Sequence, residues 1–300
     1  MPTPPFGRLL SAMVTPFTPD GSLDLDAAAT LATYLVDELG HDGLVLNGTA
    51  GEAPTTSDAE KADVVRVVLD AVGDRATILA GVGTFNTDHT LELAASAAKL
   101  GAHGVLVVTP YYSKPPQSGL LEHFTRVADA TDLPVMLYDI PHRSGVAITT
   151  ETLLRLGEHE RIVAMKDAKG DLAASAKVMA ETDLAYYSGE DAITLPLLSV
   201  GAVGIVGTST HFAGLETKAM IEAYAAGDIQ TALALHRRLL PIYTGIFATQ
   251  GCILVKAGLE LQGRGVGGLR SPIPRATAAE IDALAVALRA AGLAASPAAG

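Results

Sequence analysis

Short apolar runs alternate along the chain with longer stretches in which polar and apolar residues are mixed. The runs are too short for buried helices, and they lack the strict alternation of polar and apolar residues that marks a strand with one solvent-exposed face. This pattern is typical of strands buried on both faces. We expect strands at about residues 10–14, 43–47, 77–81, 104–108, 134–138, 162–166, 184–188 and 203–207.

A short glycine pattern returns three times, each time after an Ala/Leu-rich stretch. The copies begin at Gly40, Gly101 and Gly201, and a second glycine follows three residues later in each. The first glycine suits the position just past a helix end, where φ is positive. The second opens an aliphatic run. Each copy therefore predicts a junction from a helix to a buried strand.

Helix start signals lie between the apolar runs. Ser57 and Glu60 form a capping-box pattern before a helix from Ala59 to Val72. Other predicted helices are Ala27–Leu39 after Asp24 and Asp26, His89–Leu100 after Thr87-Asp88, and Glu151–Leu156 after Thr149-Thr150. Alternating strands and helices imply a parallel sheet. The pattern predicts an α/β fold, a (β/α)8 (TIM) barrel over residues 1–226, with its active site at the carboxyl ends of the strands.

The remainder of the chain, residues 227–300, reads as a helical extension packed on the barrel or on a partner subunit. Asp228 is the predicted N-cap of its first helix. A second amphipathic helix runs from Ala278 to Ala291, and Thr277 with Glu280 repeats the capping-box pattern. No stretch rich in Pro, Gly or Ser separates the extension from the barrel.

Composition and charge narrow the class of protein. Apolar residues make up 49% of the 300 residues and charged residues 18%, which indicates an ordered chain. The net charge of −12 argues against nucleic acid as a partner. No apolar run approaches the roughly 18 residues of a membrane span, and Leu9–Val14 is too short for a signal core. We expect no membrane association and a cytoplasmic location.

Several other features carry little chemistry. Cys252 is the one cysteine, so no disulfide can form within the chain, and we expect it in the core. The histidines show no paired metal spacing, so we assign no metal, and we expect His211 and His236 at surface or capping positions. The segment Gly263–Gly268 matches a dinucleotide-binding pattern by letter, but it precedes no clear helix and we interpret it as a loop.

The predicted strand 162–166 ends in a lysine, Lys166. Burial disfavours an ammonium ion and lowers the pKa of a lysine. A neutral amine can attack a ketone and form a Schiff base. The alternative is a lysine at the strand mouth that pairs with Asp167 or another carboxylate.

Other strand ends also carry polar groups. Thr49 lies in a glycine-rich loop whose backbone N–H groups could face an anion, although the loop could equally cap the next helix. Tyr111 and Tyr112 follow the fourth run, and for Tyr111 we favour a packing or interface role. Tyr138 can donate and accept a proton, and Arg143 can either bind a carboxylate or remain a solvated charge.

Taken together, these motifs resemble the dihydrodipicolinate synthase branch of the pyruvate-dependent, Schiff-base-forming barrel aldolases, a family that also contains N-acetylneuraminate lyase. The likeness covers nearly the whole chain. It rests on Gly48-Thr49-x-Gly51-Glu52, Thr109-Pro110-Tyr111-Tyr112, Tyr138-x-x-Pro141-x-Arg143-x-Gly145, Lys166-Asp167 and Ser188-Gly189-Glu190-Asp191, in this order.

The resemblance implies a reaction and roles for residues. Lys166 would form a Schiff base with pyruvate, while Tyr138, Thr49 and a Tyr112 from a neighbouring subunit relay protons. The enamine would then condense with L-aspartate 4-semialdehyde to give 4-hydroxy-tetrahydrodipicolinate, a step of lysine and diaminopimelate biosynthesis. Residues implied in substrate binding are Thr49, Ala50, Arg143, Gly189 and Val206; Tyr111 and Tyr112 would lie at an interface of a homotetramer built from two dimers, and no cofactor is implied.

Some positions depart from the family pattern. Ala50 stands where a second threonine is usual, His142 where a small residue is usual, and Gly207 in place of the usual aliphatic residue. Two alternatives therefore stay open: an aldolase acting on a 2-keto-3-deoxy sugar acid, and a non-catalytic barrel that binds a keto acid. The positions that match the lysine-binding interface of inhibited members are Asp58, Lys61, Phe85 and His89, and we expect no inhibition by L-lysine.

Overall fold

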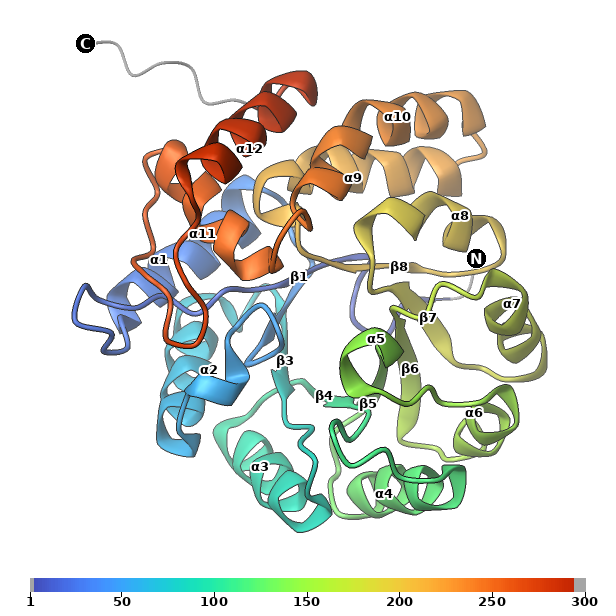
Figure 1. The fold of residues 1–300 in the computed structure, drawn as a ribbon. Helices are drawn as coiled ribbons and strands as arrows, with labels where there is room; N and C mark the ends of the chain where they lie inside the picture. Colours follow the sequence, from blue (N-terminus) through green and yellow to red (C-terminus); the bar gives the residue numbers. More distant parts are fainter. Residues whose placement is uncertain (1–2, 294–300) are drawn as a thin grey trace, which may run out of the picture.

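The computed structural model describes residues 3–293 of the chain. Its strands close into a parallel barrel in the order of the sequence, and helices surround it (Figure 1). Each strand overlaps one of the predicted apolar runs, so the predicted fold class is confirmed. The strands are β1 Leu9–Ala12, β2 Gly43–Leu46, β3 Thr77–Gly81, β4 Gly104–Val108, β5 Val135–Asp139, β6 Ile162–Asp167, β7 Ala185–Ser188 and β8 Gly204–Gly207.

The glycine repeat has the predicted geometry. Gly40, Gly101 and Gly201 have φ of 69°, 86° and 121°, the region that an L side chain rarely adopts. The second glycine of the last copy, Gly204, opens β8 beside β1. A Cβ atom there would lie 2.0 Å from the carbonyl oxygen of Arg8. Glycine at that position therefore lets the barrel close.

Helices follow the strands and cover the outside of the barrel. The predicted caps of α2 and α6 are confirmed, whereas α3 begins earlier than predicted because the side chain of Asn86 caps it. The helices are α1 Leu25–Thr33, α2 Asp58–Val72, α3 Thr87–Leu100, α4 Gln117–Asp129, α5 Pro141–Ser144, α6 Thr150–Leu156, α7 Leu172–Glu181, α8 Thr194–Ser199 and α9 Thr210–Ala225. A π-helix, η1 Tyr34–Glu38, continues α1, and two short 3-10 helices are η2 Ala53–Thr55 and η3 Asp191–Ile193.

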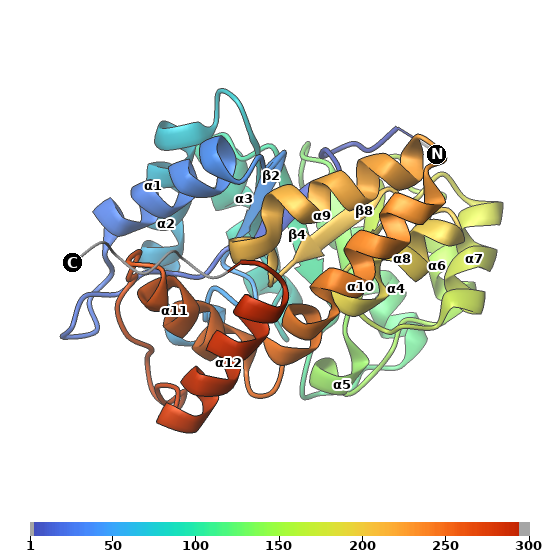
Figure 2. The same ribbon diagram turned by 90° about the horizontal axis from the view of Figure 1, so that it is seen from above.

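Up to residue 293, the C-terminal extension contains three helices, α10 Ile229–Gly245, α11 Gly251–Leu261 and α12 Ala278–Ala290. Helix α10 packs along α9, and α12 contacts both α10 and α11 (Figure 2). The caps predicted at Asp228 and at Thr277 with Glu280 are present. The division of the chain at residues 226 and 227 stays a prediction, as does the structure of the tail beyond residue 293, which lies outside the described residues.

A buried ion pair fastens the extension to the barrel. Nζ of Lys256 on α11 lies 2.7 Å from Oε1 of Glu52, and the two side chains are 2% and 0% exposed. Glu52 lies just after the loop that carries Thr49 and Ala50. Its second carboxylate oxygen accepts a hydrogen bond from the backbone N–H of Arg270. The extension is thus held against the loop that follows β2.

The structure confirms the predicted burial of Cys252 and corrects the predicted position of His211. Cys252 is buried, as predicted. His211 is not at the surface: it is fully buried, its Nδ1 lies 2.8 Å from the carbonyl oxygen of Thr208, and Nε2 accepts a hydrogen bond from the N–H of Val14. Sequence pattern did not reveal this because α9 begins at Thr210, in the turn that follows β8, and its first residues are buried. His236 is half-buried beside Tyr243.

From its sequence, the chain is not expected to associate with a membrane. Within residues 3–293, none of the helices combines the length and apolar character needed to cross a lipid bilayer.

Candidate active site

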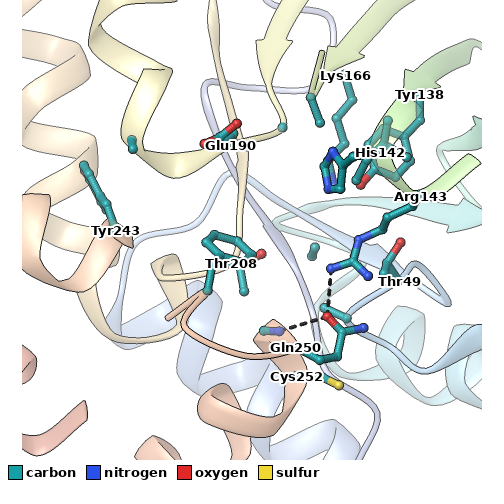
Figure 3. A pocket seen from close by; sticks show the side chains of 18 of the residues that line it. Thr49, Tyr138, His142, Arg143, Lys166, Glu190, Thr208, Tyr243, Gln250 and Cys252 are labelled. Atoms are coloured by element: carbon teal, nitrogen blue, oxygen red, sulfur yellow. Dashed lines mark hydrogen bonds between the residues drawn. The ribbon is translucent and has the colours of Figure 1, made fainter. Parts of the chain in front are cut away.

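A cavity of about 600 Å³ opens at the carboxyl ends of the strands (Figure 3). The ends of β5 and β6 and the loops after β2, β7 and β8 form one side of it, and the segment that joins α10 to α11 forms the other. A second cavity of about 330 Å³ adjoins it, and the two share Thr49, Tyr138, Ile140, Arg143 and Gln250. The larger cavity is therefore the candidate active site.

Lys166 lies near the end of β6 and points into this cavity (Figure 3). Only 5% of the residue is exposed. Burial lowers the pKa of its amine to about 8, the charge of Arg143 adds to this effect, and the carboxylate of Asp191 opposes it. At slightly alkaline pH a large share of the amine is therefore neutral, the form that attacks a carbonyl carbon.

Tyr138 lies beside Lys166 on the neighbouring strand. The two residues are register partners on β5 and β6, and Nζ of Lys166 is 4.3 Å from the centre of the Tyr138 ring. Burial raises the pKa of the phenol to about 12, and a hydrogen bond with the side chain of Thr49 opposes that rise. Tyr138 is thus a protonated phenol at neutral pH, placed between the amine and the Thr49 hydroxyl.

A buried carboxylate to which sequence reasoning gave no role, that of Asp191, acts on the amine through its charge. Asp191 is fully buried and accepts hydrogen bonds from the backbone N–H groups of Thr208 and Ser209. Burial raises the pKa of Asp191, and the hydrogen bonds from Ser209 and Thr208 oppose that rise. Its charge favours the ammonium form of Lys166. It keeps the pKa of the lysine from falling further.

Arg143 extends over the cavity from α5, next to His142, which also lines the cavity (Figure 3). Its guanidinium Nη2 donates a hydrogen bond of 2.9 Å to Oε1 of Gln250. The charge of Arg143 lowers the pKa of both Tyr138 and Lys166. Arg143 therefore supplies this cavity with a cationic group besides Lys166.

Most of the residues predicted for the site lie together. Ala50 and Gly189 line the cavity with Thr49, Tyr138, Arg143 and Lys166. Val206 does not line it: its side chain is fully buried in β8, and Thr208 is the residue of that strand end that reaches the cavity. The role of Val206 in substrate binding stays a prediction.

The two adjacent tyrosines lie apart from the amine. Tyr111 lines the smaller cavity, and its ring stands edge-on to Phe85 with 5.5 Å between the ring centres. Tyr112 is 93% exposed. Within this chain its hydroxyl does not reach the site, so a role in the relay requires a second subunit.

Residues of the extension complete the cavity, and sequence reasoning did not assign them to it. Those that line it are Tyr243, Thr244, Phe247, Thr249 and Gln250. Pro241 lies inside α10, but a proline does not show which surface the residues after it face. The packing of α10 and α11 against the barrel determines that these residues face the cavity.

These features define the class of protein. A buried amine with a lowered pKa, a phenol in contact with it and an arginine above it, all at the carboxyl end of a closed (β/α)8 barrel, are the parts of an aldolase that works through a lysine Schiff base. Residues 5–291 match the Dihydrodipicolinate synthetase family. The chain belongs to this family.

Individual relatives agree with this assignment. The chain is 66% identical over 288 residues to 4-hydroxy-tetrahydrodipicolinate synthase of Acidothermus cellulolyticus, covering 96% of this chain and 93% of the relative. It is 59% identical over 292 residues to 4-hydroxy-tetrahydrodipicolinate synthase 2 of Streptomyces coelicolor, covering 97% of each. Dihydrodipicolinate synthase of Cyanidioschyzon merolae, solved with lysine bound, superposes with a TM-score of 0.95 at 41% identity, covering 97% of this chain and 100% of that chain.

The predicted family, fold and enzyme class are therefore confirmed. The protein is a lyase of the lysine Schiff-base type. The comparisons support the synthase rather than the sugar-acid aldolase or the non-catalytic barrel.

Proposed function

We propose that this enzyme condenses pyruvate with L-aspartate 4-semialdehyde to 4-hydroxy-tetrahydrodipicolinate, and that Lys166 carries the reaction. The observation that supports this most is the buried amine of Lys166, with its pKa lowered to about 8, beside the Tyr138 ring. The names of the relatives give the product of the reaction, 4-hydroxy-tetrahydrodipicolinate.

In the first step the neutral amine of Lys166 attacks the keto carbon of pyruvate. A carbon–nitrogen bond forms, the keto oxygen leaves as water with the two protons of the amine, and the imine nitrogen takes up one further proton from solvent through the hydroxyl groups of the site, which gives a protonated imine. Backbone N–H groups near Thr49 and Ala50, with Gly189 opposite, hold the pyruvate carboxylate. All three of these residues line the cavity around the amine.

Proton transfer is the task of the hydroxyl groups. The protonated imine withdraws electrons, so the neighbouring methyl group can lose a proton and give an enamine. The phenol of Tyr138 has too high a pKa, about 12, to act alone as a base at neutral pH. It passes protons along a chain of hydroxyl groups that continues through Thr49, with which it hydrogen-bonds.

The acceptor binds in the half of the cavity below Arg143. The guanidinium holds the carboxylate of L-aspartate 4-semialdehyde, as a planar fork of donors suits a carboxylate. The enamine carbon attacks the aldehyde carbon and forms the new carbon–carbon bond. The amino group of the acceptor then displaces Lys166 at the imine carbon, which closes the ring and frees the lysine.

We further propose that the hydroxyl chain ends on Tyr112 of a neighbouring subunit in a tetramer made of two dimers. The 93% exposure of Tyr112 in the single chain supports an intersubunit contact. Mixing a Tyr112→Phe variant with a Lys166→Ala variant tests it. Hybrids would contain some sites with both wild-type residues, so activity above that of either variant is expected, and no gain would refute the shared site. A cytoplasmic location stays a prediction.

The proposed reaction is tested by steady-state assays of the purified enzyme with pyruvate and L-aspartate 4-semialdehyde, set against cleavage of a panel of 2-keto-3-deoxy sugar acids. We expect turnover of the first pair and a much lower kcat/KM for every sugar acid. Efficient cleavage of a sugar acid with no turnover of the semialdehyde would refute the proposed acceptor while leaving the lysine chemistry in place.

A further inference from the structure

Arg143 and Gln250 form a hydrogen bond across the mouth of the cavity. They are 107 residues apart in the sequence, and Nη2 of Arg143 lies 2.9 Å from Oε1 of Gln250. Arg143 stands on α5, directly after β5, whereas Gln250 belongs to the C-terminal extension (Figure 3). Within residues 3–293 this is the hydrogen bond that fixes the guanidinium group. Both side chains line both cavities.

The acceptor oxygen of Gln250 is itself held in place. Gln250 is the N-cap of α11, and its Oε1 also accepts a hydrogen bond of 2.9 Å from the backbone N–H of Gly251. One turn and a half further along, Lys256 joins the same helix to Glu52 through the buried ion pair of 2.7 Å. The amide oxygen is therefore presented to Arg143 from a helix that is anchored to the loop of Thr49 and Ala50.

We infer that Gln250 is a positioning residue for the second substrate: it orients the Arg143 guanidinium over the cavity so that the remaining N–H donors face an acceptor carboxylate. This inference rests on the proposed role of Arg143. An arginine has five N–H donors in a rigid plane, so fixing one edge aims the others. A glutamine suits the task because it is neutral and leaves the positive charge of Arg143 available to the substrate.

The same geometry links the two halves of the site. Helix α11 holds the loop of the pyruvate half at Lys256 and the arginine of the acceptor half at Gln250. A change at Gln250 should therefore affect acceptor binding without changing the reaction of pyruvate with Lys166. If Gln250 had only a structural role, its replacement would impair both acceptor binding and the reaction of pyruvate with Lys166.

The experiment compares wild-type enzyme with Gln250→Met, Gln250→Glu and Gln262→Met. Gln262 stands at the opposite end of α11, where its side-chain N–H donates to the carbonyl oxygen of Leu293, so it is a matched control. We expect Gln250→Met to raise the KM for L-aspartate 4-semialdehyde about tenfold, the effect of one lost hydrogen bond to a charged group. Gln250→Glu should raise it further, because its carboxylate would compete with that of the acceptor. Gln262→Met should leave the KM for L-aspartate 4-semialdehyde and the KM for pyruvate unchanged. Gln250→Met and Gln250→Glu should also leave the KM for pyruvate unchanged.

Arg143→Met, alone and combined with Gln250→Met, separates this inference from the proposed function. If Arg143→Met raises the acceptor KM and Gln250→Met adds nothing to it, Gln250 acts through Arg143. If Arg143→Met raises the acceptor KM but Gln250→Met alone does not, the positioning role is refuted and the role of Arg143 survives. An unchanged acceptor KM in Arg143→Met overturns both. Equal increases in the pyruvate and acceptor KM of Gln250→Met would show general damage and refute the inference.

Discussion

Nζ of Lys166 lies 4.3 Å from the centre of the Tyr138 ring, and the two residues are register partners on adjacent barrel strands. Because both side chains come from the same level of the sheet, backbone hydrogen bonding fixes their distance. Both side chains are carried by strands and not by loops. The nucleophile and the proton-relay group are thus preorganised before any substrate enters, which is the arrangement that efficient catalysis requires.

The buried amine should reduce stability at the pH where it is charged. Its pKa falls from 10.5 to about 8 on folding, so the folded state disfavours the ammonium form. The cost is complete below pH 8 and disappears above 10.5. Lys166→Met should therefore raise the free energy of unfolding at pH 6 by up to the order of 3 kcal/mol. Urea denaturation at pH 6 and pH 10.5 measures it; a loss of stability at pH 6 would contradict the assigned burial cost.

Removing the Tyr138 hydroxyl should slow proton transfer. Tyr138→Phe keeps the ring beside Lys166 but ends the hydrogen bond with Thr49, so we expect kcat to fall by about 10²- to 10⁴-fold. Tyr186→Phe is the control: Tyr186 is equally buried on β7, outside the cavity, and its hydroxyl has no hydrogen-bond partner within residues 3–293. Equal kcat values for Tyr138→Phe and wild type would rule out the relay.

The ion pair between Glu52 and Lys256 should be sensitive to loss of one partner. Lys256→Met leaves a buried carboxylate without its counter-ion, and we expect the free energy of unfolding to fall by about 3–5 kcal/mol. Adding Glu52→Gln should recover part of the loss, because the remaining group is then neutral. Urea denaturation of the single and double variants checks this. A single variant as stable as wild type would show that the pair is not buried as described.

L-lysine should not inhibit the enzyme. The polar side chains at the matching positions already pair with each other: Nε2 of His89 lies 2.9 Å from Asp58, and Lys61 lies 3.9 Å from the same carboxylate. Phe85, 61% exposed, packs edge-on against Tyr111. Initial rates over a lysine titration measure this. An inhibition constant in the low millimolar range or tighter would disprove the prediction.

The strands could be predicted from the sequence because each is a local apolar run, and Lys166 drew attention because a cation ended one of them. Tyr138 and Thr49 followed from the same logic of strand ends. Gln250 and Tyr243 could not be found in that way, because they enter the cavity through the packing of α10 and α11 against the barrel. Asp191 was missed because its contacts are with residues 17 and 18 positions further along the chain.

The register of β8 separates Val206 from Thr208, the residue of this strand end that lines the cavity. Val206 pairs with Leu10 within the barrel wall, whereas the chain turns into the cavity at Thr208. An apolar run shows where a strand lies, but not at which residue the backbone leaves the sheet. His211 was misassigned for a related reason, since α9 starts within that turn.

Covalent trapping of pyruvate tests most directly whether Lys166 carries the chemistry. The enzyme is treated with pyruvate and borohydride, which reduces an imine to a stable amine, and intact mass and peptide mapping then locate the adduct. We predict one pyruvate-derived adduct per chain on Lys166, formed faster as pH rises through about 8 and absent from Lys166→Ala. An adduct that persists in Lys166→Ala, or wild-type enzyme that turns over without forming one, would contradict the Schiff-base mechanism.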